Sequence, residues 1–283
     1  MRVLLTHAFC WPYVRRGTER NVDVWYRYLR RSGYDARILA TRPPGSEPSA
    51  DPNKLLLPQT WSPWMESLRL TPQHTFLWDA WNAIPRIESD VVHSFYFYDS
   101  LAASLRRGSG RKYGVVLQLN GVPIPGVSCR RFLPPEGLAM RRAVREADRC
   151  IVCSEFVREA LREHLNGDAV VIPPPVDPET WPCGTGERAD PPVILAVGNF
   201  NERRKGIRPL VKAFSLMRSE GRNVRLRVSG TVDAALREEL TSSVPAAVAA
   251  HIQFLGLGRP EDLPMLYQSA SVLALPAMWE PSG

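Results

Sequence analysis

The chain has 283 residues, enough for one large domain or two modest ones. Its composition, 44% hydrophobic and 23% charged, excludes a disordered or fibrous protein, and no apolar run approaches the ~18 residues that cross a bilayer. The first ten residues lack the long apolar core of a signal peptide. Five cysteines without regular spacing do not form a disulfide framework. We therefore expect a cytoplasmic protein.

The net charge of +7 at pH 7 raises the question of an anionic partner. No zinc-finger spacing, aromatic RNA-binding strand or basic zipper accompanies the arginines. We therefore expect no nucleic-acid partner. A peripheral contact with the anionic inner face of a membrane stays open.

Short apolar strands alternate with amphipathic helices in the first half of the chain. Val22, Trp25, Tyr26 and Leu29, for example, recur at helical spacing. The pattern predicts strands over residues 2–6, 34–41, 91–93, 115–119, 150–153 and 170–172, and helices over 19–31 and 155–165. Apolar strands separated by helices predict a parallel sheet that is covered on both faces.

A proline-rich stretch, 173–192, interrupts this alternation, because proline sustains neither a helix nor a central strand. The alternation then resumes, with strands predicted over 193–197, 224–229, 252–255 and 272–275, and helices over 207–217, from 233, and over 261–269. We expect an α/β protein with two doubly wound, Rossmann-like domains, 1–175 and 193–283, joined by a linker over 176–192. The last strand has no helix to cover it, so we expect the second domain to be incomplete and the chain to be truncated.

The loop before residue 207 carries three consecutive cations, Arg203, Arg204 and Lys205, followed by Gly206. Ligands of open α/β sheets bind at the carboxyl ends of strands, and helix N-termini attract anions. Cations at a helix start oppose the helix dipole, and a bound diphosphate would relieve this conflict. An arginine would bind it through a fork of hydrogen bonds and the lysine as a point charge. A solvated basic loop is the alternative.

Four other residues stand at the ends of predicted strands. Gly17 offers a backbone approach to a phosphate, although the Gly-x-Gly-x-x-Gly sequence of dinucleotide-binding folds is absent. Glu280 would accept hydrogen bonds from sugar hydroxyls, and an exposed loop glutamate is the alternative. His93 ends one strand of the first sheet, and Asn120 follows another. For His93, a structural role is the alternative to a functional one.

A metal site finds no support in the sequence. Cys150 and Cys153 have the Cys-x-x-Cys spacing, but inside a predicted strand they would point to opposite faces. The chain also lacks an Asp-x-Asp sequence that would hold a metal beside a nucleotide sugar. We expect no metal and no cofactor.

In their order and spacing, these motifs resemble the family 4 (group 1) glycosyltransferases of GT-B architecture over nearly the whole chain. The segments that carry the resemblance are 17–20, 90–93, 147–154, 172–173, 176–177, 197–198, 205–206, 228–230, 254–256, 275–276 and 280–281. The resemblance implies two Rossmann-like domains facing a cleft. It also implies retaining transfer of a sugar, without a metal, from a nucleotide-diphosphate sugar to a glycan, lipid or small-molecule acceptor.

The resemblance also implies roles for individual residues. The implied catalytic residues are Glu280, Lys205 and Asn120. The implied donor-phosphate residues are Gly17, Arg203, Arg204, Lys205 and Gly206; Gly230, Gly256 and Glu280 would line the base and sugar pocket, and His93 would lie on the acceptor side.

The chain departs from the family pattern at two of these places. Asn120 stands where a histidine is usual, and Asn199 stands where an arginine often follows the phosphate-loop glycine. An asparagine cannot act as an acid or base but can still hydrogen-bond a sugar. These departures leave a second interpretation, a truncated, non-catalytic GT-B-like module that binds a nucleotide, a glycan or a partner protein.

Overall fold

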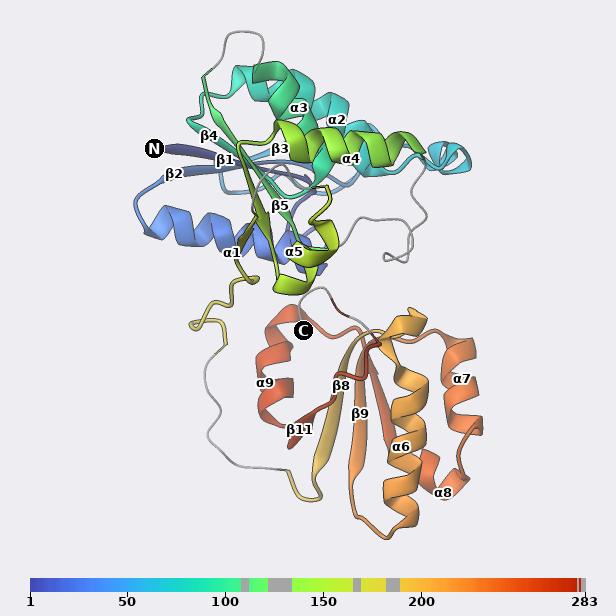
Figure 1. Ribbon diagram of the computed structural model, residues 1–283. Helices are drawn as coiled ribbons and strands as arrows, with labels where there is room; N and C mark the ends of the chain where they lie inside the picture. The colour runs from blue at the N-terminus through green and yellow to red at the C-terminus, as the bar shows by residue number, and fades with distance from the viewer. Residues whose placement is uncertain (108–111, 122–133, 165–168, 182–188, 279, 281–283) are drawn as a thin grey trace. The chain divides into compact units, whose positions relative to one another are not determined.

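The computed structural model of the chain (Figure 1) describes residues 1–107, 112–121, 134–164, 169–181, 189–278 and 280. They form two compact units divided between Val176 and Asp177. Within the described residues, no helix is both long enough and apolar enough to span a membrane.

The first unit is built on a seven-stranded parallel sheet with the strand order β3-β2-β1-β4-β5-β6-β7. Its strands are β1 (Arg2–Phe9), β2 (Asp35–Arg42), β3 (Lys54–Pro58), β4 (Val91–Ser94), β5 (Gly114–Leu119), β6 (Arg149–Val152) and β7 (Val170–Val171). Its helices are α1 (Gly17–Arg31), η1 (Pro63–Leu68), α2 (Pro72–Ala83), η2 (Ile84–Arg86), α3 (Phe97–Arg107), α4 (Pro134–Glu146) and α5 (Glu155–Leu161).

Helices cover both faces of this sheet because alternate residues of each strand point to opposite sides. In β1, Val3 and Leu5 pack with Val22 of α1. Leu4, between them, packs on the other face with Phe76 of α2. Figure 1 shows α1 on one side of the strands and α2 and α3 on the other.

The structure confirms the predicted strands of the first unit to within a few residues and adds β3, α3 and α4. Strand β3 is a five-residue edge strand whose first four residues are only half-buried; its three consecutive leucines are an apolar run that the sequence analysis did not use. In α3 every residue from Phe97 to Ser104 is buried. The buried residues include the polar Asp99, Ser100 and Ser104.

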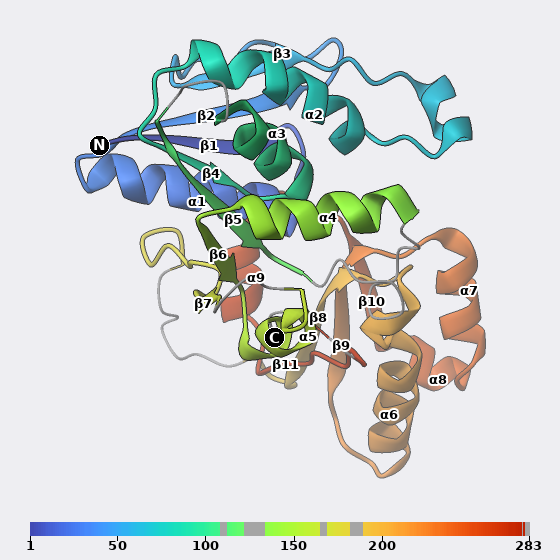
Figure 2. The same ribbon diagram turned by 45° about the horizontal axis from the view of Figure 1, so that its top comes forward.

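The second unit contains a four-stranded parallel sheet with the order β10-β9-β8-β11, whose strands are labelled in Figure 2. Its strands are β8 (Val193–Asn199), β9 (Arg225–Thr231), β10 (Ile252–Gly256) and β11 (Val272–Leu273). Its helices are η3 (Arg203–Lys205), α6 (Ile207–Ser219), α7 (Ala234–Ser242), α8 (Ala246–Ala249), η4 (Pro260–Asp262) and α9 (Leu263–Gln268). Two parallel sheets with covering helices confirm the predicted α/β class.

One local prediction was wrong. Strand β6 ends at Val152, so Cys153 lies beyond it, and Cys150 and Cys153 pack into the same core cluster instead of on opposite faces. Burial raises the pKa of the Cys150 thiol to about 11, which keeps it protonated and a poor metal ligand. Among the described residues, no group of histidine, cysteine and carboxylate side chains could hold a metal ion.

Candidate functional site

The second unit brings Glu280 to the cations that precede α6. Lys205 Nζ donates to Glu280 Oε1, although 75 positions separate the two residues. Arg204 Nη1 lies 3.0 Å from Glu280 Oε2, and Arg204 Nη2 lies 2.7 Å from Glu202 Oε2. We call Arg204, Lys205 and Glu280 the 204–280 cluster. Its side chains are 17–22% exposed, so solvent still reaches them.

Backbone contacts hold the two segments of this cluster together. The amide of Met278 donates to the carbonyl of Arg204 at 2.8 Å. Gly206 has a φ of +67°, and a Cβ at this position would lie 1.9 Å from the carbonyl oxygen of Pro276. Only glycine combines this left-handed conformation with so close an approach. Gly206 therefore sets the distance between the cationic loop and the segment that carries Glu280.

The cations lie in the turn η3, one residue before α6, which agrees with their predicted place in the loop before residue 207. Gly206 is the N-cap of α6, and no side chain caps this end, which leaves first-turn N–H groups for an anion. Arg203 is exposed and outside the cluster. The structure thus separates Arg204 and Lys205 from Arg203, with which the sequence grouped them.

Charge within the cluster is already compensated. Burial acts to lower the pKa of Arg204, but the hydrogen bond and charge of Glu280, with the charge of Glu202, outweigh it and raise that pKa. A diphosphate that binds Arg204 and Lys205 must therefore replace Glu280 as their counterion. Such an exchange would free both oxygens of Glu280 for other donors.

The glycines predicted for the base pocket lie at the carboxyl ends of neighbouring strands. Gly230 in β9 has a φ of +122°, and a Cβ there would lie 1.9 Å from the carbonyl oxygen of Gly198, its partner in β8. Close strand packing therefore accounts for Gly230. Gly256 ends β10 with a φ of +71° and open space around it. A contact of either glycine with a nucleotide base stays a prediction.

In the first unit, Asn120 follows β5 and belongs to a chain of side-chain amides. Its Oδ1 accepts hydrogen bonds from Asn21 Nδ2 of α1 and from Gln118 Nε2, both at 3.0 Å. Its Nδ2 is buried and has no hydrogen-bond partner among the described residues. Because its oxygen is occupied, the donor of Asn120 that has no partner among the described residues is this buried amide nitrogen.

His93 is the far end of the same chain. Its Nε2 lies 3.0 Å from Oε1 of the fully buried Gln118, and its ring stacks on Phe95 at 4.5 Å. Since Gln118 Oε1 can only accept, His93 carries its proton on Nε2. Burial lowers the pKa of His93 to about 4, which keeps the ring neutral. The structure thus places His93 within β4, buried against Gln118, and its predicted place on the acceptor side stays a prediction.

A second group of buried polar side chains lies beside this chain, and the sequence analysis missed it. His7 Nε2 lies 3.4 Å from Glu19 Oε1, and both residues are less than 5% exposed. Thr6 Oγ1 lies 2.8 Å from both Ser94 Oγ and Asp99 Oδ2. Burial raises the pKa of Asp99 to about 7. The signal in the sequence was Glu19, an acidic residue in the first turn of α1.

Gly17, predicted to contact a phosphate, is the first residue of α1 and is exposed. A Cβ at this position would meet nothing within 4 Å. The surroundings in the first unit therefore do not require a glycine here, and the phosphate contact stays a prediction.

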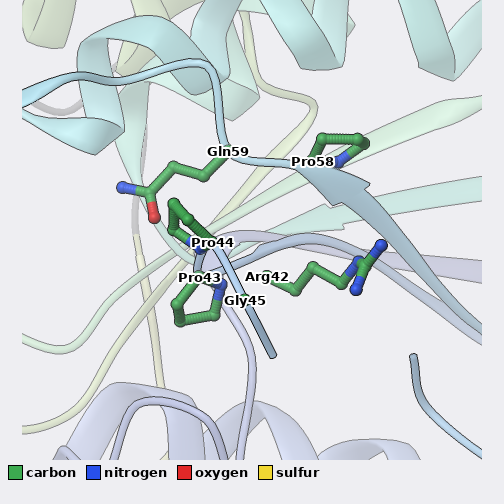
Figure 3. Close-up of a pocket in the computed structure, with 6 residues that line it drawn as sticks. All are labelled: Arg42, Pro43, Pro44, Gly45, Pro58 and Gln59. Carbon is green, nitrogen blue, oxygen red and sulfur yellow. The ribbon is translucent and has the colours of Figure 1, made fainter. Parts of the chain in front are cut away.

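A hollow of about 230 Å³ opens after β2 and β3, at the edge of the first sheet where the carboxyl ends of all its parallel strands lie. Figure 3 shows its lining, with the rings of Pro43 and Pro44 between the side chains of Gln59 and Arg42. Arg42 Nη1 donates to the carbonyl of Ser46 at 2.5 Å, which fixes the loop. The hollow offers apolar ring faces and one free amide.

Comparison with known families identifies both halves of the chain. The family model described as Glycosyltransferase Family 4 matches residues 15–180, and that described as Glycosyl transferases group 1 matches residues 191–283. No curated protein sequence matches the chain significantly.

Solved structures share the fold at low sequence identity. Sucrose-phosphate synthase from Thermosynechococcus elongatus has a TM-score of 0.77 and 18% identity, over 100% of this chain and 77% of that one. WaaG, a glycosyltransferase involved in lipopolysaccharide biosynthesis, has a TM-score of 0.70 and 15% identity, over 99% and 76% of the two chains. A trehalose-6-phosphate protein from E. coli, bound with UDP-2-fluoro glucose, has a TM-score of 0.70 and 12% identity, over 100% and 80%. The two units are thus those of the GT-B fold.

Proposed function

Because the chain belongs to Glycosyltransferase Family 4, we propose that this glycosyltransferase moves a sugar from a nucleotide-diphosphate sugar to a glycan, lipid-linked or small-molecule acceptor, with retention of configuration. The observation that carries the proposal is the 204–280 cluster, in which two cations and a carboxylate converge behind the carboxyl ends of β8 and β11. The E. coli neighbour, which binds UDP-2-fluoro glucose, supports a donor of this kind.

The cluster suits both halves of such a donor. As the bond between the sugar C1 and the diphosphate oxygen breaks, negative charge grows on the departing diphosphate, and Arg204 and Lys205 would stabilise it. Glu280, released from these cations, would accept hydrogen bonds from the sugar hydroxyls. The uncapped end of α6 adds N–H donors toward the phosphates. We propose a reaction without a metal or cofactor, because the two side chains supply the positive charge that a metal ion would supply.

The first unit would hold the acceptor. The amide N–H of Asn120, which has no partner in the part of the chain that the structure describes, would donate to a sugar or acceptor oxygen, and the chain from His93 through Gln118 fixes the orientation of Asn120. The hollow beside Pro43 and Pro44 would receive an apolar ring face of the acceptor. Gly17 would contact the diphosphate through its backbone. The net charge of +7 supports a cytoplasmic protein that touches an anionic membrane surface.

Titration calorimetry with UDP, ADP and GDP tests the proposal. Lys205→Ala is expected to weaken binding of the preferred nucleotide by ~1.5–3 kcal/mol, because a charge-assisted hydrogen bond is lost. Lys212→Ala, which removes the same charge from an exposed position of α6, is the control, expected within ~0.5 kcal/mol of wild type. Equal losses of binding free energy in the two variants would contradict the assignment of Lys205 to the donor phosphate.

Turnover decides between the enzyme and the non-catalytic module. Release of the nucleoside diphosphate from its nucleotide sugar is expected for wild type and not for Glu280→Gln. Nucleotide binding without turnover of any nucleotide sugar would favour the module.

A further inference from the structure

A second basic site lies in the second unit, along β10, an end strand of its sheet. It is a pocket of about 420 Å³ whose polar and aromatic lining consists of Arg225, Arg227, Arg237, His251, Gln253 and Phe254. Its arginines come from β9 and α7.

This pocket is separate from the 204–280 cluster. Arg225 begins β9 and His251 precedes β10, so they mark the amino ends of these strands. The 204–280 cluster follows the carboxyl ends of β8 and β11. Since all four strands are parallel, the two places lie toward opposite edges of one sheet.

The positive charge of the pocket is not compensated by its own lining, which contains no acidic residue. Elsewhere in this unit, surface arginines lie against carboxylates, as Arg208 does against Glu239 at 2.6 Å. Three arginines that line one hollow give it a positive potential that attracts an anion.

Two of the guanidinium groups are held in place before any ligand arrives. Arg237 lies over the ring of Phe254, with 5.2 Å from Cζ to the ring centroid. Arg227 Nε donates to Gln253 Oε1 at 3.2 Å, so the other end of that amide is a donor. The lining thus presents fixed hydrogen-bond donors and no carboxylate.

We propose that this pocket binds the phosphate group of a small phosphorylated molecule, at a site independent of the donor diphosphate. Planar guanidinium forks match phosphate oxygens in geometry as well as charge. The volume falls in the range of small-molecule sites, ~300–1,000 Å³. A soluble phosphoester and a lipid headgroup share this chemistry, and they differ in whether the phosphate arrives from solution or from a membrane surface.

Titration calorimetry with inorganic pyrophosphate tests the proposal on the whole chain. Wild type is expected to show two sites. The double variant Arg225→Ala/Arg237→Ala, in which both changed residues are exposed, is expected to lose one of them, with affinity at least tenfold weaker. Lys205→Ala is expected to lose the other, so failure of this proposal is distinguishable from failure of the proposed function.

The matched control is Arg222→Ala/Arg259→Ala, which removes the same charge from exposed positions of the same unit and is expected to keep both sites. A single wild-type site that disappears in Lys205→Ala would overturn the proposal, and so would equal losses in the two double variants.

Two further ligands identify the source of the phosphate. Binding of glucose 6-phosphate that depends on Arg225 and Arg237 would assign the pocket to soluble phosphoesters. The alternative result is binding to phosphatidylcholine vesicles that contain phosphatidylglycerol, and not to vesicles of pure phosphatidylcholine. If only this binding depends on Arg225 and Arg237, the pocket is assigned to a lipid headgroup. Dependence with neither would overturn the proposal.

Discussion

Glu280 Oε2 lies 3.0 Å from Nη1 of Arg204, so the carboxylate expected to bind the donor sugar is already the counterion of a cation expected to bind the donor diphosphate. The two roles are therefore coupled. We expect an anion that binds Arg204 and Lys205 to compete with Glu280 for these cations, and its binding would free Glu280 for the sugar.

Glu280→Gln tests this coupling. This change removes the negative charge of the side chain and keeps its shape. It is expected to strengthen pyrophosphate binding at the cluster by about tenfold, ~1.4 kcal/mol, because the carboxylate no longer competes with pyrophosphate for the cations. Calorimetry measures the change. Glu239→Gln, which releases Arg208 outside the cluster, should leave binding unchanged. Weaker binding in Glu280→Gln would mean that Glu280 positions the cations more than it competes.

Gly206→Ala is expected to disrupt the second unit. The new Cβ would overlap the carbonyl of Pro276 at a left-handed φ of +67°, so the loop and the segment that carries Glu280 must separate. Gly221→Ala is the matched control, because its φ is +80° and its surroundings are open; it should cost only the backbone strain, ~1–2 kcal/mol. Urea denaturation compares the two. Equal costs would show that the contact with Pro276 is not tight.

Asp99→Asn is expected to change how stability depends on pH. The pKa of Asp99 is raised from 3.8 to about 7 in the folded protein, so between these values the folded form holds a proton that the unfolded chain releases. The stability contribution of Asp99 is therefore present below pH ~4 and lost as the pH rises toward ~7, by on the order of a few kcal/mol.

Denaturation of the Asp99→Asn variant from pH 4 to pH 7 should lack this loss. Asp90→Asn is the control in the same unit, because hydrogen bonds from Arg2 lower the pKa of Asp90 to about 2, outside the window. Parallel pH profiles of wild type and Asp99→Asn would contradict the assignment.

Gln118→Leu should break the chain that orients Asn120. The change leaves the buried Nε2–H of His93 without its acceptor and removes one donor from Asn120 Oδ1, at a cost of ~1–3 kcal/mol. The ¹⁵N signal of His93 Nε2 should shift in the same variant. Gln59→Leu, a partly exposed glutamine of the same unit, is expected to cost less than ~0.5 kcal/mol. An unshifted His93 signal would argue against the hydrogen bond.

The fold and the place of the site followed from the sequence, because both depend on local pattern. Each strand or helix is predicted from its own apolar run or helical spacing. The loops that follow parallel strands all lie at one edge of the sheet. That rule was enough to select Arg204, Lys205, Asn120 and Glu280. The apolar run of β3, three consecutive leucines at the edge of the sheet, was not used in the sequence analysis.

Only the tertiary structure decided which of these side chains meet. Glu280 reaches Lys205 because β11 pairs with β8, and the neighbourhood of Thr6 and Asp99 exists because β4 lies beside β1. Neither strand pairing can be predicted from the spacing of residues within one strand or helix. Burial, charge compensation and the shifts in pKa all depend on such long-range neighbours. The sequence by itself therefore determined which residues form the candidate site, and only the packed structure decided which of their side chains are in contact.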